Sequence, residues 1–222
     1  MHIPSSALRL PVLAAALLGL AACATGEAPK PAAEAKPAAP AGNAKPLLTG
    51  FASATATEAG ADVVDIVYSE KKDDAALTSK DFAGGVLTVN GQVGTGKGSQ
   101  WAGVGVSMNV AKGEMPKIDA SGYTSVTFRL ASPTTGSLRL RIMGDEQAVR
   151  NAGCYPIFVQ PVTDKLTEYT IKLEAFQPEG WCGAQARRVA QTLPVFGGFE
   201  IVDVAMLKKP TRFSVGSITL NP

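Results

Sequence analysis

Alternation of apolar and polar residues is the dominant pattern in this chain, and it is clearest from Ser125 to Gly144. Apolar residues stand at positions 126, 128 and 130 and, after a Pro/Gly turn, again at 138, 140 and 142. Period-two alternation on both sides of a turn predicts two antiparallel strands that each bury one face. The other face then collects Arg129, Arg139 and Arg141. These arginines either lie in water or line a ligand surface.

Further short strands are predicted along the chain, separated by Gly, Pro, Asn, Asp and Ser. The predicted strands are Val63–Tyr68, Gly85–Val89, Val104–Val110, Ser125–Ala131, Ser137–Met143, Tyr155–Gln160, Glu168–Leu173, Phe199–Ala205 and Phe213–Leu220. One helical turn is plausible, from Ala184 to Gln191. Many short, regularly spaced strands predict an all-β protein, a sandwich or jelly roll.

The N-terminus has the pattern of an export signal. Arg9 precedes an apolar run from Val12 to Ala22, which is too short to span a bilayer as a mature helix. The run ends in Leu20-Ala21-Ala22-Cys23, which resembles the bacterial lipobox. The alternative is an ordinary secretory signal with an incidental cysteine. We expect a signal peptide over residues 1–22, an Ala/Pro-rich tether over 23–46 and a jelly-roll β-sandwich domain over 47–222.

The lipobox resemblance implies that Cys23 carries acyl chains, palmitate among them, which together anchor the mature protein stably in a membrane. Ala24 follows the cysteine where an aspartate would suggest retention in the inner membrane. We therefore expect a lipoprotein anchored in the bacterial outer membrane.

Charge separates the domain from nucleic-acid binders. From Leu47 onward, 17 Lys and Arg balance 17 Asp and Glu, so its formal charge is zero, whereas nucleic-acid binders carry a basic excess. An acidic run precedes residue 82: Glu58, Asp62, Asp65, Glu70, Asp73, Asp74 and Asp81. Such a run could supply a structural calcium ligand, but it contains no recognisable calcium loop. A solvated acidic surface is favoured, and no cofactor is expected.

Two cysteines remain once Cys23 is lipidated. In an exported protein, Cys154 and Cys182 are expected to form a disulfide, with free or metal-binding thiols as the minor alternative.

Three patterns with possible catalytic or nucleotide-binding chemistry favour simpler interpretations. The segment 91–97 begins like a phosphate-binding loop, but Gly98 takes the place of the magnesium ligand and a strand follows instead of a helix. Glu200 and Asp203 lie an odd number of residues apart, which puts them on opposite faces of a strand, so a surface-charge pattern is favoured over a catalytic pair. The only histidine, His2, lies in the signal, so Ser-His and Cys-His nucleophile pairs are excluded. We therefore expect no enzymatic activity, with carboxylate-only or lysine-based catalysis as the open alternative.

Three aromatic residues could meet a sugar, whose flat C–H faces stack on rings. Tyr155 and Trp181 adjoin the two cysteines, so a disulfide would bring both rings to one edge. The competing interpretation is that Trp181 packs on the disulfide. For Trp101, at a strand start, a core position is favoured.

Four segments together resemble galactose-binding-like jelly rolls. They are Ile118–Tyr123 running into Val126–Phe128, Glu168–Leu173 with Phe176, Phe213–Leu220, and Gly84–Val89. The similar families are the family 11 carbohydrate-binding modules and the complex I intermediate-associated protein 30 domain. The sequence departs from their pattern at Leu166, Lys172 and Gly216-Ser217, where these families often have Trp, Pro and Asp-Asn.

The sequence therefore predicts a non-catalytic, membrane-anchored lipoprotein whose domain binds a glycan. The predicted ligand-binding residues are Arg129, Arg139, Arg141, Tyr155 and Trp181, and arginines would favour an acidic or heavily hydroxylated ligand. The alternative, implied by the second family, is an interaction or assembly module with an envelope protein as its partner. A glycosidase is a third hypothesis, and it would need two facing carboxylates in a groove.

Overall fold

The computed structural model describes residues 45–70, 74–94, 100–108, 117–204 and 209–222. Contacts divide the chain into two units, Met1–Pro37 and Ala38–Pro222, and every described residue belongs to the second. The predicted signal peptide, Cys23 and nearly all of the tether lie outside the described residues. No helix within the described ranges is long and apolar enough to cross a membrane.

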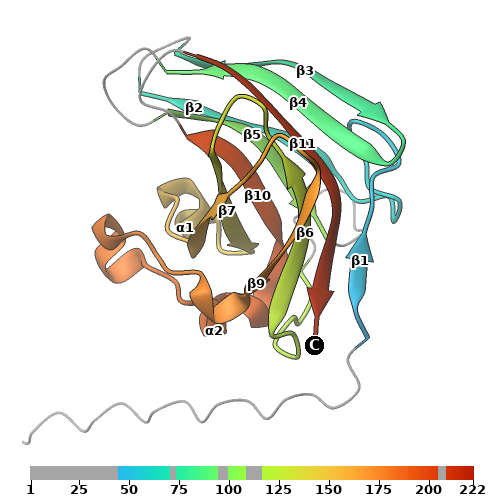
Figure 1. Ribbon diagram of the computed structural model, residues 1–222. Coiled ribbons are helices and arrows are strands. Elements are labelled where there is room, and N and C mark those ends of the chain that lie inside the picture. Colours follow the sequence, from blue (N-terminus) through green and yellow to red (C-terminus); the bar gives the residue numbers. More distant parts are fainter. Residues whose placement is uncertain (1–44, 71–73, 95–99, 109–116, 205–208) are drawn as a thin grey trace, which may run out of the picture. The chain divides into compact units, whose positions relative to one another are not determined.

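Two antiparallel sheets face each other across a common core (Figure 1). The first sheet has the order β3 (Ala75–Ala83), β4 (Val86–Val93), β11 (Lys209–Asn221), β6 (Ser125–Ala131) and β9 (Thr167–Lys172), and β1 (Leu47–Thr49) pairs with the end of β11. The second sheet has the order β2 (Val63–Ser69), β5 (Gln100–Ser107), β10 (Phe196–Val204), β7 (Ser137–Gly144) and β8 (Ile157–Pro161). Strand neighbours come from distant parts of the chain, as in jelly rolls. The all-β jelly-roll prediction is confirmed.

The apolar half of the strand alternation forms the core between the sheets. Leu138, Leu140 and Ile142 of β7 point inward from the second sheet, opposite the inward side chains of the first. The rings of Phe128 from β6 and Phe199 from β10 meet edge to face across the core, with centroids 5.0 Å apart. The polar half of each strand is therefore left on the outer faces.

The structure corrects the expected pairing of the two central strands. The segments Ser125–Ala131 and Ser137–Gly144 are both strands, but β6 pairs with β9 and β11, whereas β7 pairs with β8 and β10. Alternation shows which face of a strand is buried, but the connection over residues 132–136 crosses from one sheet to the other. The prediction that the three arginines share a sheet face is therefore wrong.

Short helices occupy the connections between strands: α1 (Gln147–Ala152), η1 (Leu173–Ala175), η2 (Gly180–Gln185), α2 (Val189–Thr192) and η3 (Leu193–Val195). The predicted helical turn from Ala184 to Gln191 is only partly correct. The backbone is non-helical at Ala186 and extended at Arg188, so two separate helical pieces flank a non-helical link.

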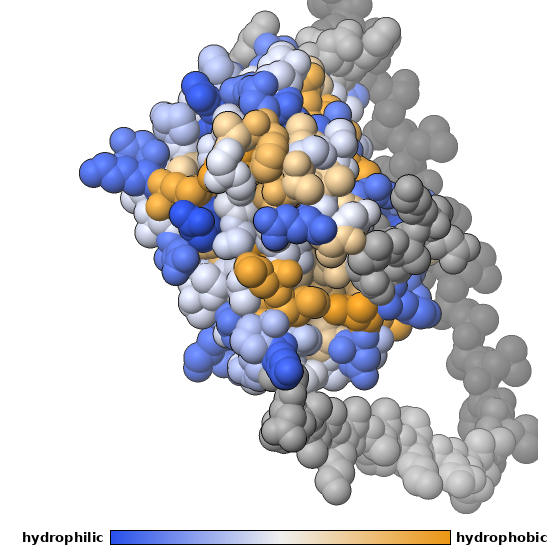
Figure 2. All heavy atoms as spheres, turned by 90° about the vertical axis from the view of Figure 1, so that its right-hand side faces the viewer, coloured by the Kyte–Doolittle hydropathy of each residue, from blue (hydrophilic) through white to orange (hydrophobic). Residues whose placement is uncertain are grey.

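Apolar side chains also reach the surface. Figure 2 shows apolar residues in separate patches on one face, among hydrophilic ones. The exposed large apolar residues within the described ranges are Leu48, Val64, Val67, Tyr68, Phe82, Val159, Trp181 and Val204. Tyr68, Trp181 and Val204 line the groove described next.

Candidate ligand-binding groove

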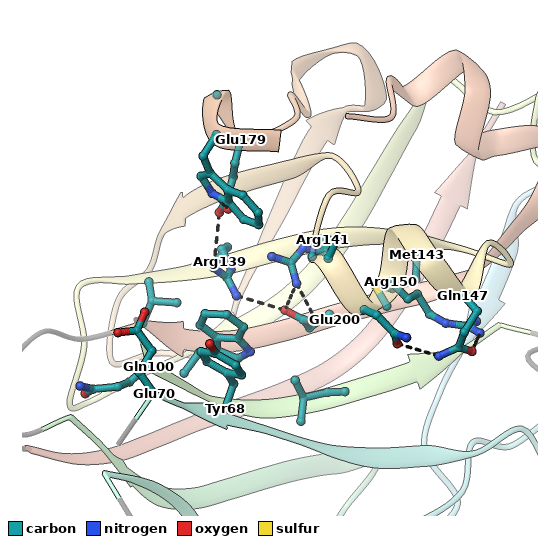
Figure 3. Close-up of a pocket in the computed structure, with 18 residues that line it drawn as sticks. Tyr68, Glu70, Gln100, Arg139, Arg141, Met143, Gln147, Arg150, Glu179 and Glu200 are labelled. Atoms are coloured by element: carbon teal, nitrogen blue, oxygen red, sulfur yellow. Dashed lines mark hydrogen bonds and ion pairs between the residues drawn. The ribbon is translucent and has the colours of Figure 1, made fainter. Parts of the chain in front are cut away.

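A groove of about 1120 Å³ lies on the outer face of the second sheet. Its floor comes from β2, β5, β10 and β7, and residues of α1 and of the segment leading into η2 complete its lining (Figure 3). Because core and outer residues alternate along each strand, the floor carries the residues that the core leaves out. Arg139 and Arg141 of β7 and Glu200 of β10 are the central polar ones.

These three side chains form a buried ionic cluster. Arg141 donates from Nη1 to both carboxylate oxygens of Glu200, at 2.9 and 3.0 Å, and Arg139 donates from Nη2 to Oε1 at 3.3 Å. Their exposed fractions are 7% for Arg139 and 3% each for Arg141 and Glu200. Burial lowers the pKa of the Arg139 guanidinium below its ordinary value, and the neighbouring Arg141 charge lowers it further, while Glu200 and Glu179 oppose the change. The cluster holds fixed hydrogen-bonding groups at the groove floor.

Aromatic rings extend this cluster towards β2. Tyr68 and Trp101 are cross-strand partners whose rings stack with centroids 4.3 Å apart, and the Arg139 guanidinium carbon lies 4.5 Å from the Trp101 centroid. Tyr68 and Arg139 approach from strands on opposite sides of β5, so Trp101 is held between them. The contact between Arg139 and Trp101 is a cation–π interaction. Because Tyr68 and Arg139 occupy the two faces of the Trp101 ring, Trp101 holds these side chains in place rather than offering a face to a ligand. The outer face of Tyr68 is the one that this stack leaves for a ligand.

The opposite wall is the segment that carries Glu179 and Trp181. Glu179 accepts a hydrogen bond from Arg139 Nη1 at 3.4 Å and another from the Trp181 indole nitrogen at 2.6 Å. Trp181 nevertheless keeps 65% of its surface exposed. Figure 3 shows Glu179 above Arg139, directed down at it. The carboxylate thus ties an exposed indole to the groove floor.

The residues beneath this wall explain how it lies so close to the sheet. Helix α1 ends at Gly153, whose φ of 68° is left-handed and favours glycine. A Cβ at Gly153 would lie 3.6 Å from Arg141 Nη2 and 3.7 Å from Cη2 of Trp181. Both distances are ordinary van der Waals contacts, so it is the left-handed φ, not a lack of space, that favours glycine at the point where α1 packs against Arg141 and Trp181.

Two cross-links hold the wall segment to the α1 segment. Cys154 and Cys182 form the predicted disulfide, with a sequence separation of 28. Arg187 makes a two-pronged contact with Glu146, at 2.9 and 2.7 Å. The hydrogen bonds from Arg187 lower the pKa of the Glu146 carboxyl below its ordinary value. Covalent and ionic links thus act on the same pair of segments.

The groove is balanced in charge. Among the residues that the structure describes, its lining includes three arginines and three glutamates: Arg139, Arg141, Arg150, Glu70, Glu179 and Glu200. The arginines alone had favoured an acidic or heavily hydroxylated ligand. With each of the central arginines bound to a carboxylate, the groove offers paired donors and acceptors without a net positive charge.

The structure brings Arg139, Arg141 and Trp181 together in the groove but not the other two predicted residues. Arg129 lies on the outer face of the first sheet, where it pairs with Glu168 at 3.8 Å. Tyr155 is only 1% exposed, and its hydroxyl accepts a hydrogen bond from the Glu146 backbone N–H at 2.8 Å. Burial raises the pKa of the Tyr155 hydroxyl. Tyr155 supports the start of α1 and has no exposed ring face for a ligand.

Two further expectations were wrong in an informative way. Trp101, expected in the core, faces the groove because Ala102, Val104 and Val106 take the inward positions of β5. Glu200 and Asp203 do face opposite sides, but both are buried and neither forms a surface-charge pattern. The alternation along the strands could have placed Trp101 and Glu200 on the outer face. Trp101 precedes inward Ala102, and Glu200 lies between inward Phe199 and Ile201. Glu179, by contrast, lies in an irregular segment where no periodic signal operates.

The phosphate-loop-like segment and the acidic run do not form a nucleotide site or a metal site in the described residues. Gly91 and Val93, from the start of the phosphate-loop-like segment, belong to β4, and residues 95–99 lie outside the described residues. Strand β5 follows in place of the helix that a phosphate loop requires. Of the acidic run, Asp65 pairs with Lys80 at 2.6 Å. No group of three or more His, Cys, Asp or Glu side chains in the described part of the chain could hold a metal ion.

Comparison with solved structures finds carbohydrate-binding modules at low identity. The family 11 module of the cellulase Lic26A-Cel5E of Clostridium thermocellum is 15% identical, with 73% of this chain and 82% of that chain covered and a TM-score of 0.45. The family 30 module of a second cellulase of that organism is 12% identical, with 80% and 98% covered and a TM-score of 0.46. A low-affinity xylan-binding module, CBM86, from Roseburia intestinalis is 16% identical, with 71% and 95% covered and a TM-score of 0.36.

At these identities and TM-scores, the likeness carries no inference about the ligand of this chain. No protein-family model matches the sequence, and no curated protein matches it. The groove's own geometry must therefore support any functional proposal.

Proposed function

We propose that the groove binds a neutral glycan and does not alter it chemically. The observation that supports this most directly is the exposed Trp181 indole beside the buried cluster of Arg139, Arg141 and Glu200, whose remaining positive charge is balanced by Glu179. Sugar rings offer flat C–H faces that pack on aromatic rings, and their hydroxyls both donate and accept. The outer face of Tyr68 supplies a second apolar surface across the groove from Trp181.

Ion pairing in the groove argues against glycoside hydrolysis. A glycosidase needs one carboxyl group that delivers a proton and a second carboxylate across the scissile bond. Glu200 accepts hydrogen bonds from both Arg139 and Arg141, and Glu179 accepts from Arg139 and Trp181. Both carboxylates are therefore engaged as hydrogen-bond acceptors within the groove and are not arranged as a pair that faces a scissile bond. Binding without catalysis is therefore the proposal.

The test is a glycan array with neutral and acidic oligosaccharides, followed by calorimetric titration of those that bind. Trp181→Ala should raise the dissociation constant about tenfold or more, because Trp anchors contribute strongly to binding. Phe82→Ala removes an exposed aromatic ring from the first sheet and is the matched control, with affinity unchanged. Absence of specific binding to any glycan would overturn the proposal.

The alternative of an interaction or assembly module predicted an apolar or charged patch without a cleft. The cleft on the second sheet makes it the weaker proposal. The interaction-module alternative would gain support if an envelope protein co-purified stably with the chain from membranes. That protein should then still co-purify with the Trp181→Ala and Arg139→Ala variants.

We also propose that the chain is a lipoprotein tethered to the bacterial outer membrane through Cys23. The Leu20–Cys23 tetrapeptide and the Ala/Pro-rich stretch after it support this proposal. Growth with an alkyne-labelled fatty acid should label the wild-type chain and not Cys23→Ala. Unlabelled wild type, or label in the inner-membrane fraction, would contradict it.

A further inference from the structure

A small notch adjoins the groove floor beside Glu200. It has a volume of about 40 Å³ and shares Ile66, Met143 and Glu200 with the main groove. Its lining is mainly apolar, from Val64 and Ile66 of β2 and Met143 of β7. Figure 3 shows Met143 on the side of Arg141 away from Arg139. The groove therefore has aromatic rings at one end and an apolar recess at the other.

The notch exists because β5 has a glycine at one outward position. In the sheet register, Gly105 lies between Val64 of β2 and Glu200 of β10. A Cβ at Gly105 would lie 3.0 Å from Val64 Cγ2 and 3.4 Å from Ile66 Cδ1. Any side chain at this position would therefore enter the recess and fill it.

The size and lining of the notch favour a methyl group. A water molecule occupies roughly 30 Å³ in the liquid and needs two to four polar partners to be held in a cavity. The notch is of that order of size, but its side chains from β2 and β7 are apolar. A methyl group has a similar size and gains from leaving water.

A hydrogen-bond acceptor lies beside this recess. Glu200 Oε1 accepts from both arginines, whereas Oε2 accepts within the described residues only from Arg141 Nη1, at 3.0 Å. A carboxylate oxygen has lone pairs for two acceptor contacts. Oε2 can therefore accept a second hydrogen bond from a ligand N–H. A methyl group and an N–H donor on adjacent atoms are the components of an acetamido group.

We propose that the notch receives the methyl of an N-acetyl substituent and that the groove prefers N-acetylated glycans. The acetamido N–H would donate to Glu200 Oε2. An O-acetyl ester has the methyl but no such donor, so it would satisfy only half of this arrangement. This inference rests on the proposed glycan-binding function and names the substrate class of the same site.

The experiment compares oligosaccharides that differ only at one ring position, where one member has an acetamido group and the other a hydroxyl. The first pair is chitotetraose and cellotetraose, which share the β-1,4-linked backbone, and further matched pairs come from the array. By calorimetric titration, the N-acetylated member should bind about fivefold tighter or more, because both members can donate a hydrogen bond at this position but only the acetamido group also buries a methyl in the notch.

Two variants probe the notch itself. Gly105→Ala should bring the ratio of the two dissociation constants close to one by filling the recess. Val64→Thr keeps the side-chain volume but places a hydroxyl in the recess, so it should also reduce the ratio of the two dissociation constants. Val64 is an exposed residue of β2, so this variant leaves strand β5 unchanged. Gly136→Ala is the matched control, since a Cβ there meets nothing within 4 Å, and it should keep the wild-type ratio.

The outcomes separate this inference from the function on which it rests. If no glycan binds, the proposed function fails and the inference fails with it. If glycans bind with equal affinity across matched pairs, or better without the N-acetyl group, the inference alone is overturned. A preference that persists unchanged in both folded variants, as judged by thermal unfolding, would likewise overturn it.

Discussion

At the scale of single residues, strand parity decides which polar side chains reach the groove. Glu200 points outward because its neighbours Phe199 and Ile201 point into the core, and its register partner on β7 is Arg141. The consequence is a carboxylate that is almost fully buried against two guanidinium groups. Removal of one member of a buried ionic cluster costs far more than the net contribution of the cluster, because the remaining charge stays buried.

Glu200→Ala should therefore lower the free energy of unfolding by about 3–5 kcal/mol, measured by urea denaturation. Glu168→Ala is the matched control, because Glu168 meets Arg129 at 3.8 Å on the exposed face of the first sheet. That pair should contribute less than about 1 kcal/mol. The double variant Arg141→Met with Glu200→Met replaces the closest pair by apolar side chains and should recover much of the loss. Equal effects at Glu200 and Glu168 would contradict the buried-cluster account.

At the scale of elements, alternation identified most of the strands but not their partners. The segments that became β6 and β7 have the same pattern, yet a five-residue connection sends them to different sheets, and this separates Arg129 from the groove. Hydrophobic period reports which face is buried, whereas strand pairing depends on contacts far apart in the sequence. Strand β3 was not predicted because it is an edge strand whose residues are mostly half-exposed or exposed.

The groove wall that carries Glu179 and Trp181 was only partly predictable from the sequence. The sequence predicted the disulfide and placed Trp181 beside it, because two cysteines remain for an exported domain. It could not predict Glu179, since an irregular segment has no period to show where its side chains point. It also could not show that Tyr155 is buried, because adjacency to a cysteine gives no information on exposure. Residues in regular strands were thus more predictable than those in connections.

The disulfide should support both the stability of the domain and the shape of this wall. Cys154→Ala with Cys182→Ala should lower the free energy of unfolding by about 3–4 kcal/mol, as expected from loop-closure entropy at this sequence separation. Glycan affinity should fall about two- to tenfold, because Glu179 and Trp181 would need to be ordered on binding. Reductant should reproduce both effects in the wild type and leave the double variant unchanged. Unchanged affinity with reduced stability would show that Arg187 and Glu146 suffice to hold the wall.

At the scale of the whole molecule, charge balance recurs at two levels. From Leu47 onward, the acidic and basic residues are equal in number, and the described part of the groove lining repeats this equality with three arginines and three glutamates. A groove whose central charges are satisfied internally has little long-range attraction for an ion. Its recognition must then come from short-range contacts with rings, hydrogen-bonding groups and the notch. This distinguishes it from an arginine surface that captures acidic polymers.

Ionic strength tests that distinction directly. Screening weakens interactions between separated charges over a Debye length of about 10 Å at 0.1 M salt, but it has little effect on contacts with a neutral ligand. The dissociation constant for a neutral oligosaccharide should therefore change by less than about twofold between about 0.05 M and about 0.5 M NaCl. An acidic oligosaccharide of the same length serves as the comparison, and it should bind more weakly at every salt concentration. If the acidic ligand bound more tightly at low salt and lost that advantage as salt rose, net positive charge would govern the groove, and Glu200 and Glu179 would not neutralise its arginines as their contacts indicate.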